Sequence, residues 1–544
     1  MEKNLLFSLM LVGLLVSGIC ASQSTAGEFH VTNATEFQNA LNTAESNGED
    51  DTIYLGAGIY QGNFSYMPPD TEHKSLAITG EPGTSPEDVI LDGQNSGRVL
   101  LITDSHDYSD GVVPGIFITG ITVQNGNSNY TGGGIYAAFS SYNISMTRCI
   151  IKNNKTTGKG GGVWMGIQFN GSGTVVLENN VILNNMVTEN DINHLSVGGG
   201  VYVYSGSSTD ATFVIRNNII AGNAAQGADP HGGGLYVYHY SDTGTVTHLI
   251  NNTIYGNMAN KGGGVSIYRS NNANTYNNII YGNSAMQGAD IYFQNVTSTI
   301  GYNNNYSNMY GTWTDSGANL NTDPLFVSTQ NNDFRLQPTS SMINAGTTAV
   351  PDPPGLPSTD FEGNPRVTGP APDIGAYESF PVNPSEGTIG REITITGSGF
   401  GARKGKVLVG TVALKILEWT GSSIRCQLTR ALSPGPYDVT IRPKGVSAIV
   451  LEDGFTVKVP EIESVEPTSG LAGDEITING LFFGTKKPKV TLGGKSCKVL
   501  SWTKDPTTGE SEIDFVVPKR LTLGGNELKV ANGVGSGTTT FTVE

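Results

Sequence analysis

The chain contains little charge, few cysteines and, after its first twenty residues, no hydrophobic run long enough to cross a bilayer. Charged residues make up only 15% of its 544 residues, whereas intrinsically disordered chains are highly charged. The composition therefore argues against a disordered protein. Hydrophobic residues make up 37%, and 72 residues are glycine. This composition is typical of an all-β protein with many turns and polar Asn, Ser and Thr surfaces.

Cysteine is too scarce and too scattered for a disulfide framework. Four cysteines occur, and removal of an N-terminal export signal would leave Cys149, Cys426 and Cys497. An odd number of cysteines in separate regions predicts isolated buried thiols.

The N-terminus predicts export. Lys3 precedes an apolar run from Leu5 to Val16, which is too short for a spanning helix. Residues 1–21 therefore have the organisation of a secretory signal peptide. Ile19 stands where a lipoprotein signal has a small residue, so ordinary cleavage near Ala21 is favoured. We expect an extracellular or cell-surface protein with no transmembrane segment.

Basic residues are scarce in the first part of the chain. Residues 1–380 hold 31 acidic and 12 basic side chains, a net charge of −19, whereas residues 381–544 carry a net charge of +2. Residues 28–126 contain 15 acidic side chains against Lys74 and Arg98. Such a surface repels nucleic acid and anionic lipid, which argues against both as partners.

A phrase of three glycines followed by an alternating strand recurs along the middle of the chain. The triplets begin at Gly132, Gly160, Gly198, Gly232 and Gly262, and a degenerate copy begins at Gly288. Asn-rich phrases such as LENNVILNN, IRNNIIAGN and INNTIYGN lie between them. A period near 30 residues is the signature of a stacked solenoid.

The repeating unit predicts coils of short parallel strands, because it contains β-branched alternation and turn residues but nothing that resembles a helix. Asn at a fixed turn is expected to hydrogen-bond from coil to coil, and Gly at a fixed corner to allow left-handed backbone angles. Ala34 to Gly48 places apolar residues at helical spacing and predicts a helix that caps the open end. We expect about nine coils.

The alternating glycine-triplet and I-x-x-N phrases, such as IAGN at 220–223, resemble the polymorphic outer membrane protein repeats of bacterial surface β-helices. The later phrases DFEGNPR and DIGAYE (Asp373 to Glu378) are similar to the closing segment of exported bacterial β-helix proteins. The resemblance covers residues 28–380 and implies a right-handed parallel β-helix. It says little about function, because adhesins, passengers, lyases and hydrolases share this fold.

Residues 381–544 contain two copies of one frame, G-x-x-G-x-x-I-T-I-x-G, each followed by a tryptophan, Trp419 or Trp502. Short strands at regular intervals around a tryptophan suggest small sandwiches. The copies resemble IPT/TIG immunoglobulin-like domains, which implies two such domains at 381–459 and 460–544. The expected fold is therefore all-β, with a capped right-handed parallel β-helix followed by two immunoglobulin-like sandwiches.

No catalytic residues are assigned from the sequence. The tripeptide NTD at 321–323 occurs in polygalacturonases, but the further carboxylates and the histidine of that chemistry do not follow. Residues 127–300 contain only seven acids, which is too few for the clustered calcium ligands of a lyase. Asp104, Asp107 and Asp110 could chelate calcium, although an ordinary acidic loop is favoured. We therefore expect no cofactor, with calcium as the alternative.

The tyrosine-rich strands that follow the triplets predict two aromatic columns. If the aliphatic residue after each triplet faces the core, the next residue faces outward. The first column, which we expect to be exposed, consists of Tyr136, Trp164, Tyr202, Tyr236, Ser266 and Tyr292. The second consists of Tyr204, Tyr238 and Tyr268. Stacked rings of this kind can also serve only to stabilise neighbouring coils.

Two lengthened loops flank these strands and supply polar side chains. One contains Asp191 and His194, and the other contains Asp229 and His231. Aromatic faces pack on sugar rings while such side chains bind hydroxyl groups. We therefore predict a glycan-binding groove formed by Tyr202, Tyr204, Tyr236 and Tyr238, with Asp191, His194, Asp229 and His231 at its rim.

These features favour a secreted or cell-surface bacterial repeat protein that binds a polysaccharide or another surface component, with the IPT/TIG pair as a stalk. A polysaccharide lyase or glycoside hydrolase that uses the same face is the first alternative. A purely structural spacer is the second. The sequence gives no indication of oligomeric state.

Overall fold

The structure is a computed structural model. It describes residues 27–69, 72–103, 113–139, 142–168, 172–188, 195–206, 210–240, 244–270, 272–296, 298–304, 308–337, 339–379, 382–396, 400–401, 403–421, 423–444, 448–503 and 510–544. The expected signal peptide at 1–21 and the acidic loop of Asp104, Asp107 and Asp110 lie outside these ranges. No helix in the described ranges is long and apolar enough to span a membrane.

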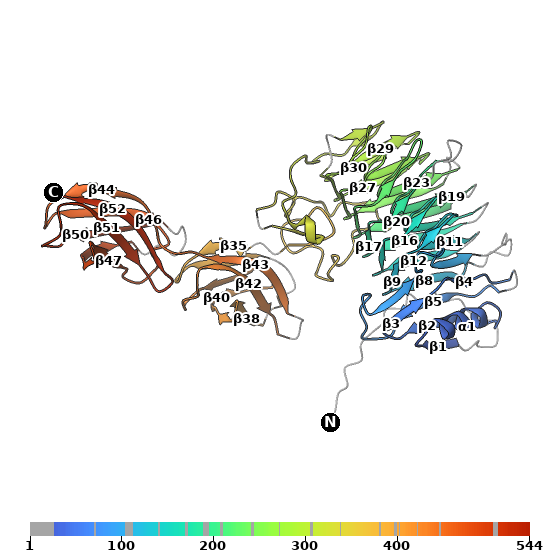
Figure 1. Cartoon of the computed structure of the whole chain (residues 1–544), viewed down its shortest axis with the longest axis horizontal. Helices are drawn as coiled ribbons and strands as arrows, with labels where there is room; N and C mark the ends of the chain where they lie inside the picture. Colours follow the sequence, from blue (N-terminus) through green and yellow to red (C-terminus); the bar gives the residue numbers. More distant parts are fainter. Residues whose placement is uncertain are drawn as a thin grey trace, which may run out of the picture.

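A right-handed parallel β-helix forms the first part of the molecule, as the repeats predict (Figure 1). Sheet A contains β1 (Gly27–Val31), β2 (Asp51–Leu55), β5 (Leu76–Gly80), β8 (Gly115–Thr119), β12 (Asn143–Thr147), β16 (Ser172–Glu178), β20 (Asp210–Arg216), β24 (Val246–Ile250), β27 (Ala273–Tyr276), β30 (Ser298–Gly301) and β32 (Thr314–Asp315). Sheet B contains β3 (Gly58–Gln61), β6 (Val89–Asp92), β9 (Thr122–Gln124), β13 (Ile150–Lys152), β17 (Val181–Leu183), β21 (Ile219–Ala221), β25 (Thr253–Tyr255) and β28 (Ile279–Tyr281).

Two further sheets complete the coils. Sheet C contains β4 (Phe64–Tyr66), β7 (Leu100–Thr103), β11 (Ile135–Phe139), β15 (Val163–Ile167), β19 (Val201–Ser205), β23 (Leu235–His239), β26 (Val265–Tyr268), β29 (Ile291–Gln294) and β31 (Met309–Tyr310). Sheet D contains β10 (Asn127–Ser128), β14 (Lys155–Thr156), β18 (Met186–Val187) and β22 (Ala224–Ala225). Sheet A has eleven parallel strands, sheet C nine and sheet B eight, which agrees with the expectation of about nine coils.

Helix α1 (Ala34–Ala44) caps the N-terminal end of the stack, as predicted. Asn33 caps the helix through its side chain, which accepts a hydrogen bond from the backbone N–H of Glu36. Phe37, Leu41 and Ala44 are fully buried against the first coils. The helix thereby covers apolar side chains that the first coil would otherwise expose.

Buried asparagines link the coils, and they form two ladders rather than one. The first ladder contains Asn154, Asn185, Asn223, Asn257 and Asn283. The second contains Asn180, Asn218, Asn252, Asn278 and Asn303. In each step, the side-chain amide and the backbone N–H of one asparagine both donate to the side-chain oxygen of the next. The ladders therefore satisfy buried backbone groups at two corners of every coil in this part of the stack.

The glycine triplets form a third corner, for two separate reasons. Gly232 has a φ of +62°, a conformation that few other residues adopt. Gly233 lies so close to the next coil that an added Cβ would be 2.4 Å from the carbonyl oxygen of Met258. The triplet thus permits a sharp turn and the close approach of neighbouring coils, as the sequence predicts.

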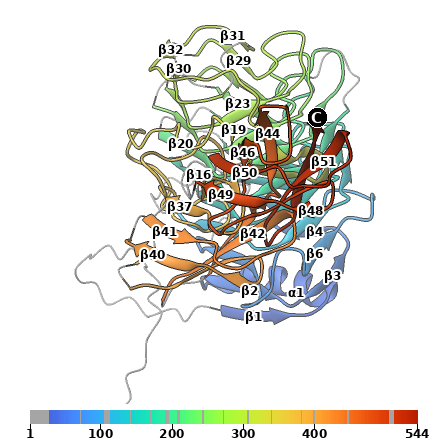
Figure 2. The same ribbon diagram turned by 90° about the vertical axis from the view of Figure 1, so that its left-hand side faces the viewer.

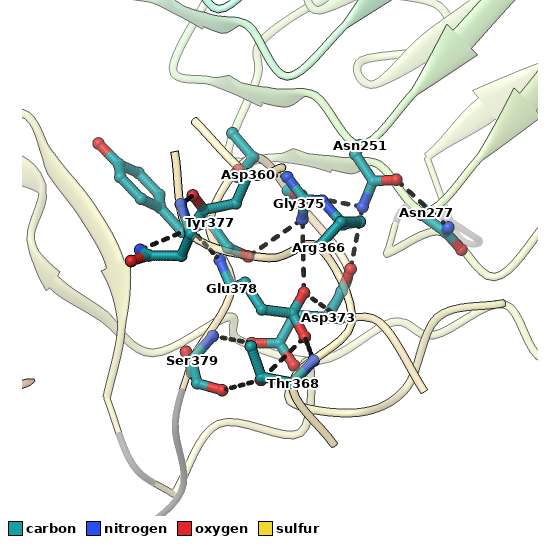
Figure 3. A network of polar contacts seen from close by, with 12 residues as sticks. Asn251, Asn277, Asp360, Arg366, Thr368, Asp373, Gly375, Tyr377, Glu378 and Ser379 are labelled. Atoms are coloured by element: carbon teal, nitrogen blue, oxygen red, sulfur yellow. Dashed lines mark hydrogen bonds and ion pairs between the residues drawn. The ribbon is translucent and has the colours of Figure 1, made fainter. Parts of the chain in front are cut away.

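Residues 320–379 form a closing segment that packs on the outer face of sheet B. It contains β33 (Phe326–Ser328), the short 3-10 helix η1 (Thr329–Asn331) and β34 (Asp333–Leu336). Asparagines at the corners of the coils hold it by hydrogen bonds. The amide of Asn251 donates to the carbonyl oxygens of Asp373 and Gly375, at 3.0 and 3.1 Å (Figure 3).

A buried charged cluster organises the end of this segment (Figure 3). The guanidinium of Arg366, only 1% exposed, lies 3.6 Å from a carboxylate oxygen of Glu378 and donates to the side-chain oxygen of Asn217 at 2.7 Å. Glu378 and Asp373 both accept hydrogen bonds from backbone N–H groups of the segment. These contacts attach DFEGNPR and DIGAYE to the β-helix, and they explain why charged residues occur inside both phrases.

The last part of the chain forms two small sandwiches, which lie to one side of the β-helix, beyond the closing segment (Figures 1 and 2). The first contains β35 (Val382–Asn383), β37 (Glu392–Thr396), β40 (Lys415–Trp419) and β41 (Ser423–Gln427), facing β36 (Glu386–Gly387), β38 (Lys406–Val409), β39 (Val412–Ala413), β42 (Gly435–Arg442) and β43 (Ile449–Val457). The second contains β44 (Glu461–Glu466), β46 (Glu475–Leu481), β49 (Lys498–Trp502) and β50 (Glu510–Val516), facing β45 (Ser469–Gly470), β47 (Lys489–Leu492), β48 (Lys495–Ser496), β51 (Gly524–Ala531) and β52 (Ser536–Val543).

The three cysteines of the described ranges are free thiols. Cys149 and Cys426 are buried, as predicted, whereas Cys497 is half-buried. Burial raises the pKa of the Cys149 and Cys426 thiols to about 12, so both remain protonated at neutral pH.

Removal of residues 381–544 is expected to leave a cooperatively folded β-helix. The apolar core inside the coils and the smaller core under the closing segment are separate from the cores of the two sandwiches. Circular dichroism of the truncated chain should show a single melting transition, and residues 381–544 expressed alone serve as the control. An insoluble or unfolded truncated chain would show that this boundary is wrong.

Candidate functional site

The outer face of sheet C carries the aromatic residues of the repeats in strict register. Tyr136, Trp164, Tyr202, Tyr236, Ser266, Tyr292 and Tyr310 occupy equivalent positions on successive strands. Tyr204, Tyr238 and Tyr268 align two residues further on, and Gln294 follows them on the next strand. Both predicted columns therefore exist, and the first extends one strand further, to Tyr310.

The first column is largely buried, so our expectation of an exposed column was wrong. Trp164, Tyr202 and Tyr236 are 5%, 4% and 3% exposed. They form an apolar cluster outside the core of the coils, together with Ala138 and Val197. Alternation correctly predicted that these rings point away from that core, but it could not show that neighbouring corners and side chains would cover them.

Cations and a histidine cover the first column. The Arg98 guanidinium lies 4.8 Å from the ring centre of Tyr136, and the Lys159 ammonium lies 5.8 Å from that of Tyr202. His231 contacts the rings of Tyr236 and Tyr292, with centroids 6.0 and 5.7 Å away. Because the column has a serine between those two tyrosines, the imidazole packs against both at the point where the column lacks a ring.

The predicted rim residues have different environments. Asp229 is partly exposed, and its carboxylate is 2.8 Å from the Lys261 ammonium and 3.3 Å from His231 Nε2. Burial would raise the pKa of Asp229, but hydrogen bonds from Lys261 and His231 lower it overall. His231 is buried, and burial lowers its pKa, so the ring is neutral at neutral pH. Asp191 and His194 lie outside the described residues.

The second column is half-buried and forms a regular stack. The rings of Tyr204 and Tyr238 have centroids 5.8 Å apart and an interplanar angle of 11°. Those of Tyr238 and Tyr268 are 5.2 Å apart at 4°. Parallel rings at these separations overlap in an offset stack, so the ring faces are directed at one another. The exposed parts are therefore mainly ring edges and hydroxyl groups.

Side chains occupy both ends of this stack. Trp164 packs against Tyr204 at 5.6 Å, and the Arg269 guanidinium lies 5.3 Å from the ring centre of Tyr268. Burial raises the pKa of the Tyr204 and Tyr238 hydroxyls, so both are protonated at neutral pH. Each can donate one hydrogen bond and accept another. The face can therefore form a row of polar contacts, but it leaves little flat ring surface for a ligand.

Several residues of this face could not be predicted from the sequence. Arg98 and Lys159 approach the rings from corners of the coils, and no motif marks them. Tyr310 follows no glycine triplet, although it continues the first column by register. Among the described residues, no group of three or more His, Cys, Asp or Glu side chains could hold a metal ion.

Comparisons with known proteins identify the folds of the separate parts. Residues 95–247 match the family model of the right-handed β-helix region, and residues 381–457 and 460–543 match that of the IPT/TIG domain. The resemblance to polymorphic outer membrane protein repeats stays a prediction.

Similarity to individual proteins is partial. A stretch of 94 residues is 33% identical to a cyclomaltodextrin glucanotransferase of Geobacillus stearothermophilus, covering 16% of this chain and 13% of that enzyme. A stretch of 156 residues is 31% identical to human fibrocystin-L, covering 27% of this chain and 4% of that protein. A surface glycan-binding protein of Prevotella bryantii aligns with 32% of this chain and 40% of its own, at 14% identity and a TM-score of 0.17. The chain thus spans only a small part of the curated relatives that it matches.

Proposed function

Because this chain joins a right-handed parallel β-helix to two IPT/TIG domains, we propose that it is an exported cell-surface protein that binds polysaccharide along sheet C. The IPT/TIG pair serves as its stalk. The observation that carries this proposal is the half-exposed row of Tyr204, Tyr238 and Tyr268 on three adjacent coils. The signal peptide at 1–21 and the polar loop of Asp191 and His194 belong to the same proposal.

The row suits a long, hydroxyl-rich chain. Successive coils place equivalent tyrosine rings 5.8 and 5.2 Å apart, so a polymer that lies along the stack meets the same group repeatedly. The ring stack holds the hydroxyls in place before a ligand arrives, which reduces the entropy lost on binding. Tyr202 and Tyr236, which we predicted to contact the ligand, pack beside this row, with ring centroids 6.1 and 6.4 Å from those of Tyr204 and Tyr238. His231, predicted at the rim, packs against Tyr236.

Binding fits this face better than hydrolysis or elimination. Among the described residues, the carboxylate–histidine pair at this face is formed by Asp229 and His231. The carboxylate is engaged by Lys261, and the imidazole is buried between two tyrosine rings. A general acid or base must reach the proton that it transfers, and His231 is 5% exposed.

Replacing Tyr204 and Tyr238 together with phenylalanine is expected to weaken retention on a bound polysaccharide at least about tenfold. The change removes two hydroxyls but keeps both rings, so the melting temperature should stay nearly unchanged. Affinity electrophoresis against a panel of neutral and acidic polysaccharides measures retention, with Tyr54→Phe on sheet A as the matched control. Replacement of the same tyrosines with serine should abolish retention and also destabilise the stack, by about 0.2–1 kcal/mol for each ring pair.

Two results would count against this proposal. Unchanged retention of the double phenylalanine variant would show that the hydroxyl row does not contact the ligand. Failure of the wild-type chain to be retained by any polysaccharide of the panel would favour the structural spacer.

A further inference from the structure

Among the described residues of the two columns on sheet C, a flat ring face can be free only where a column ends. Inside the columns, rings pack against the rings of neighbouring coils. Where the first column has Ser266, His231 packs against Tyr236 and Tyr292 instead. The second column has Trp164 at one end and Arg269 at the other. The first column ends at Tyr310 on β31, the last strand of sheet C among the described residues.

Tyr310 has one face engaged and one face open. Its ring lies parallel to that of Tyr292, at an interplanar angle of 4° and a centroid separation of 5.0 Å. No other ring or cation of the described residues packs against it, and the residue is 47% exposed, whereas Tyr292 is 7% exposed. Tyr310 is therefore a terminal platform on a column that fixes its orientation.

A hollow of about 610 Å³ lies beside this platform. Its lining consists of Tyr292, Phe293, Gln294, Asn295, Val296, Tyr310, Gly311 and Thr312. Its volume is within the range of about 300–1,000 Å³ that small-molecule sites usually have. On this coil, Gln294 occupies the position that tyrosines hold in the second column.

The hollow contains polar side chains that could contact a ligand. Among the described residues, the side chains of Gln294, Asn295 and Thr312 form no hydrogen bond, although all three line the hollow. Two amides and a hydroxyl offer both donors and acceptors. No charged side chain belongs to the lining. A ligand that fits would therefore have one flat apolar face, several hydroxyl groups and no charge.

We propose that the hollow beside Tyr310 binds one neutral pyranose ring, whose carbon-bound hydrogens pack on the free face of Tyr310 while Gln294, Asn295 and Thr312 bind its hydroxyl groups. This inference extends the proposed function, on which it rests, because it gives sheet C a ring-binding site at the end of its row of hydroxyls. A sugar chain that lies along the stack would place one ring there.

The test uses the full chain and two small neutral probes, methyl β-D-glucopyranoside and methyl β-D-galactopyranoside. Saturation-transfer difference NMR should show contact with at least one probe, strongest at the carbon-bound hydrogens of one ring face. Titration of the Tyr310→Ala variant should show affinity weaker by about tenfold, and the Tyr310→Phe variant should bind as the wild type does. Gln294→Ala should weaken binding without altering the platform. D-glucuronate should bind less well than either neutral probe.

Several outcomes would overturn this inference. The first is that the wild-type chain binds neither probe. The second is that the Tyr310→Ala variant binds as tightly as the wild type. The third is that the chain prefers D-glucuronate to the neutral probes. If Tyr310→Ala lowers the melting temperature, Gln294→Ala decides the question, because it leaves the ring column intact. The Tyr204 and Tyr238 phenylalanine variant should still bind the small probes. Polysaccharide retention without Tyr310-dependent ring binding would therefore exclude the hollow while leaving the proposed function in place.

Discussion

Replacing Asn218 with leucine is expected to destabilise the β-helix by about 3–6 kcal/mol. Asn218 is fully buried and lies between Asn180 and Asn252 in the second ladder. Its side-chain amide donates to the carbonyl oxygen of Leu177 and to the side chain of Asn252, at 2.8 and 3.0 Å. Its side-chain oxygen accepts from both nitrogens of Asn180. Leucine would leave two or three of these buried groups without a partner, at about 1–3 kcal/mol each.

Thermal and urea unfolding of the β-helix provide the measurement. Asn127→Ala is the matched control, because Asn127 is exposed on sheet D and forms one long side-chain hydrogen bond of 3.5 Å. Asn218→Asp should also be destabilised, because a carboxylate cannot donate to Leu177 or Asn252. If the Asn218→Leu variant has the same melting temperature and urea midpoint as the control, the ladder is not a main source of stability.

Replacing Arg366 with methionine is expected to detach the closing segment, at a cost of about 3–5 kcal/mol. Among the described residues, the Arg366 guanidinium is the one cation that interacts with the carboxyl groups of Asp360, Asp373 and Glu378. All four side chains are buried. The guanidinium also donates to the carbonyl oxygens of Gly375 and Ala376, at 3.1 and 2.7 Å. Its loss leaves buried carboxyls without a counter-charge and carbonyl groups without a donor.

Limited proteolysis within residues 320–379 measures detachment directly. Arg335→Met is the control, because Arg335 pairs with Asp333 at a more exposed site on the same segment. If the Arg366→Met variant resists the protease as well as the wild type does, the charged cluster does not hold the closing segment in place.

The same cluster predicts how the attachment of the segment depends on pH. Burial raises the pKa of Asp373, and burial together with the nearby Asp373 charge raises that of Glu378. The folded state therefore binds more protons than the unfolded chain above about pH 4, where free carboxyls ionise. The stability that these two groups contribute is present in acid and falls as the pH rises. The defect of Arg366→Met should accordingly be smaller at pH 5 than at pH 8.

Sequence patterns determined the architecture of this protein, because each pattern reports a local backbone requirement. Glycine triplets mark a corner where the first glycine has a positive φ and the second lies too close to the next coil to leave room for a Cβ atom, which glycine alone lacks. The asparagine at the end of each I-x-x-N phrase marks a turn whose buried backbone needs a partner. Alternation after the triplets assigned the aromatic residues of both columns to the correct side of sheet C.

Exposure of those aromatics was decided only by the tertiary structure. Period-two alternation separates inside from outside, but it contains no information on what covers an outward side chain. Lys159 and His231 each precede a glycine triplet, and they pack against the buried rings of Tyr202 and Tyr236. The first asparagine of each NN pair is a similar case. The NN phrase predicts a turn at this residue. Only the packed structure shows that Asn217 and Asn251 bind the closing segment, more than a hundred residues away.

The orientation of the rings was also beyond the reach of the sequence. Sequence order placed Tyr204, Tyr238 and Tyr268 in one column, because a parallel register repeats the same position on every coil. Whether such rings present faces or edges depends on side-chain rotation, which the packing of neighbouring coils fixes. The stack directs their faces at one another and leaves a free face at the terminal ring, Tyr310. The sequence thus determined the column of tyrosines, and the packing of one coil on the next determined where a sugar ring could lie.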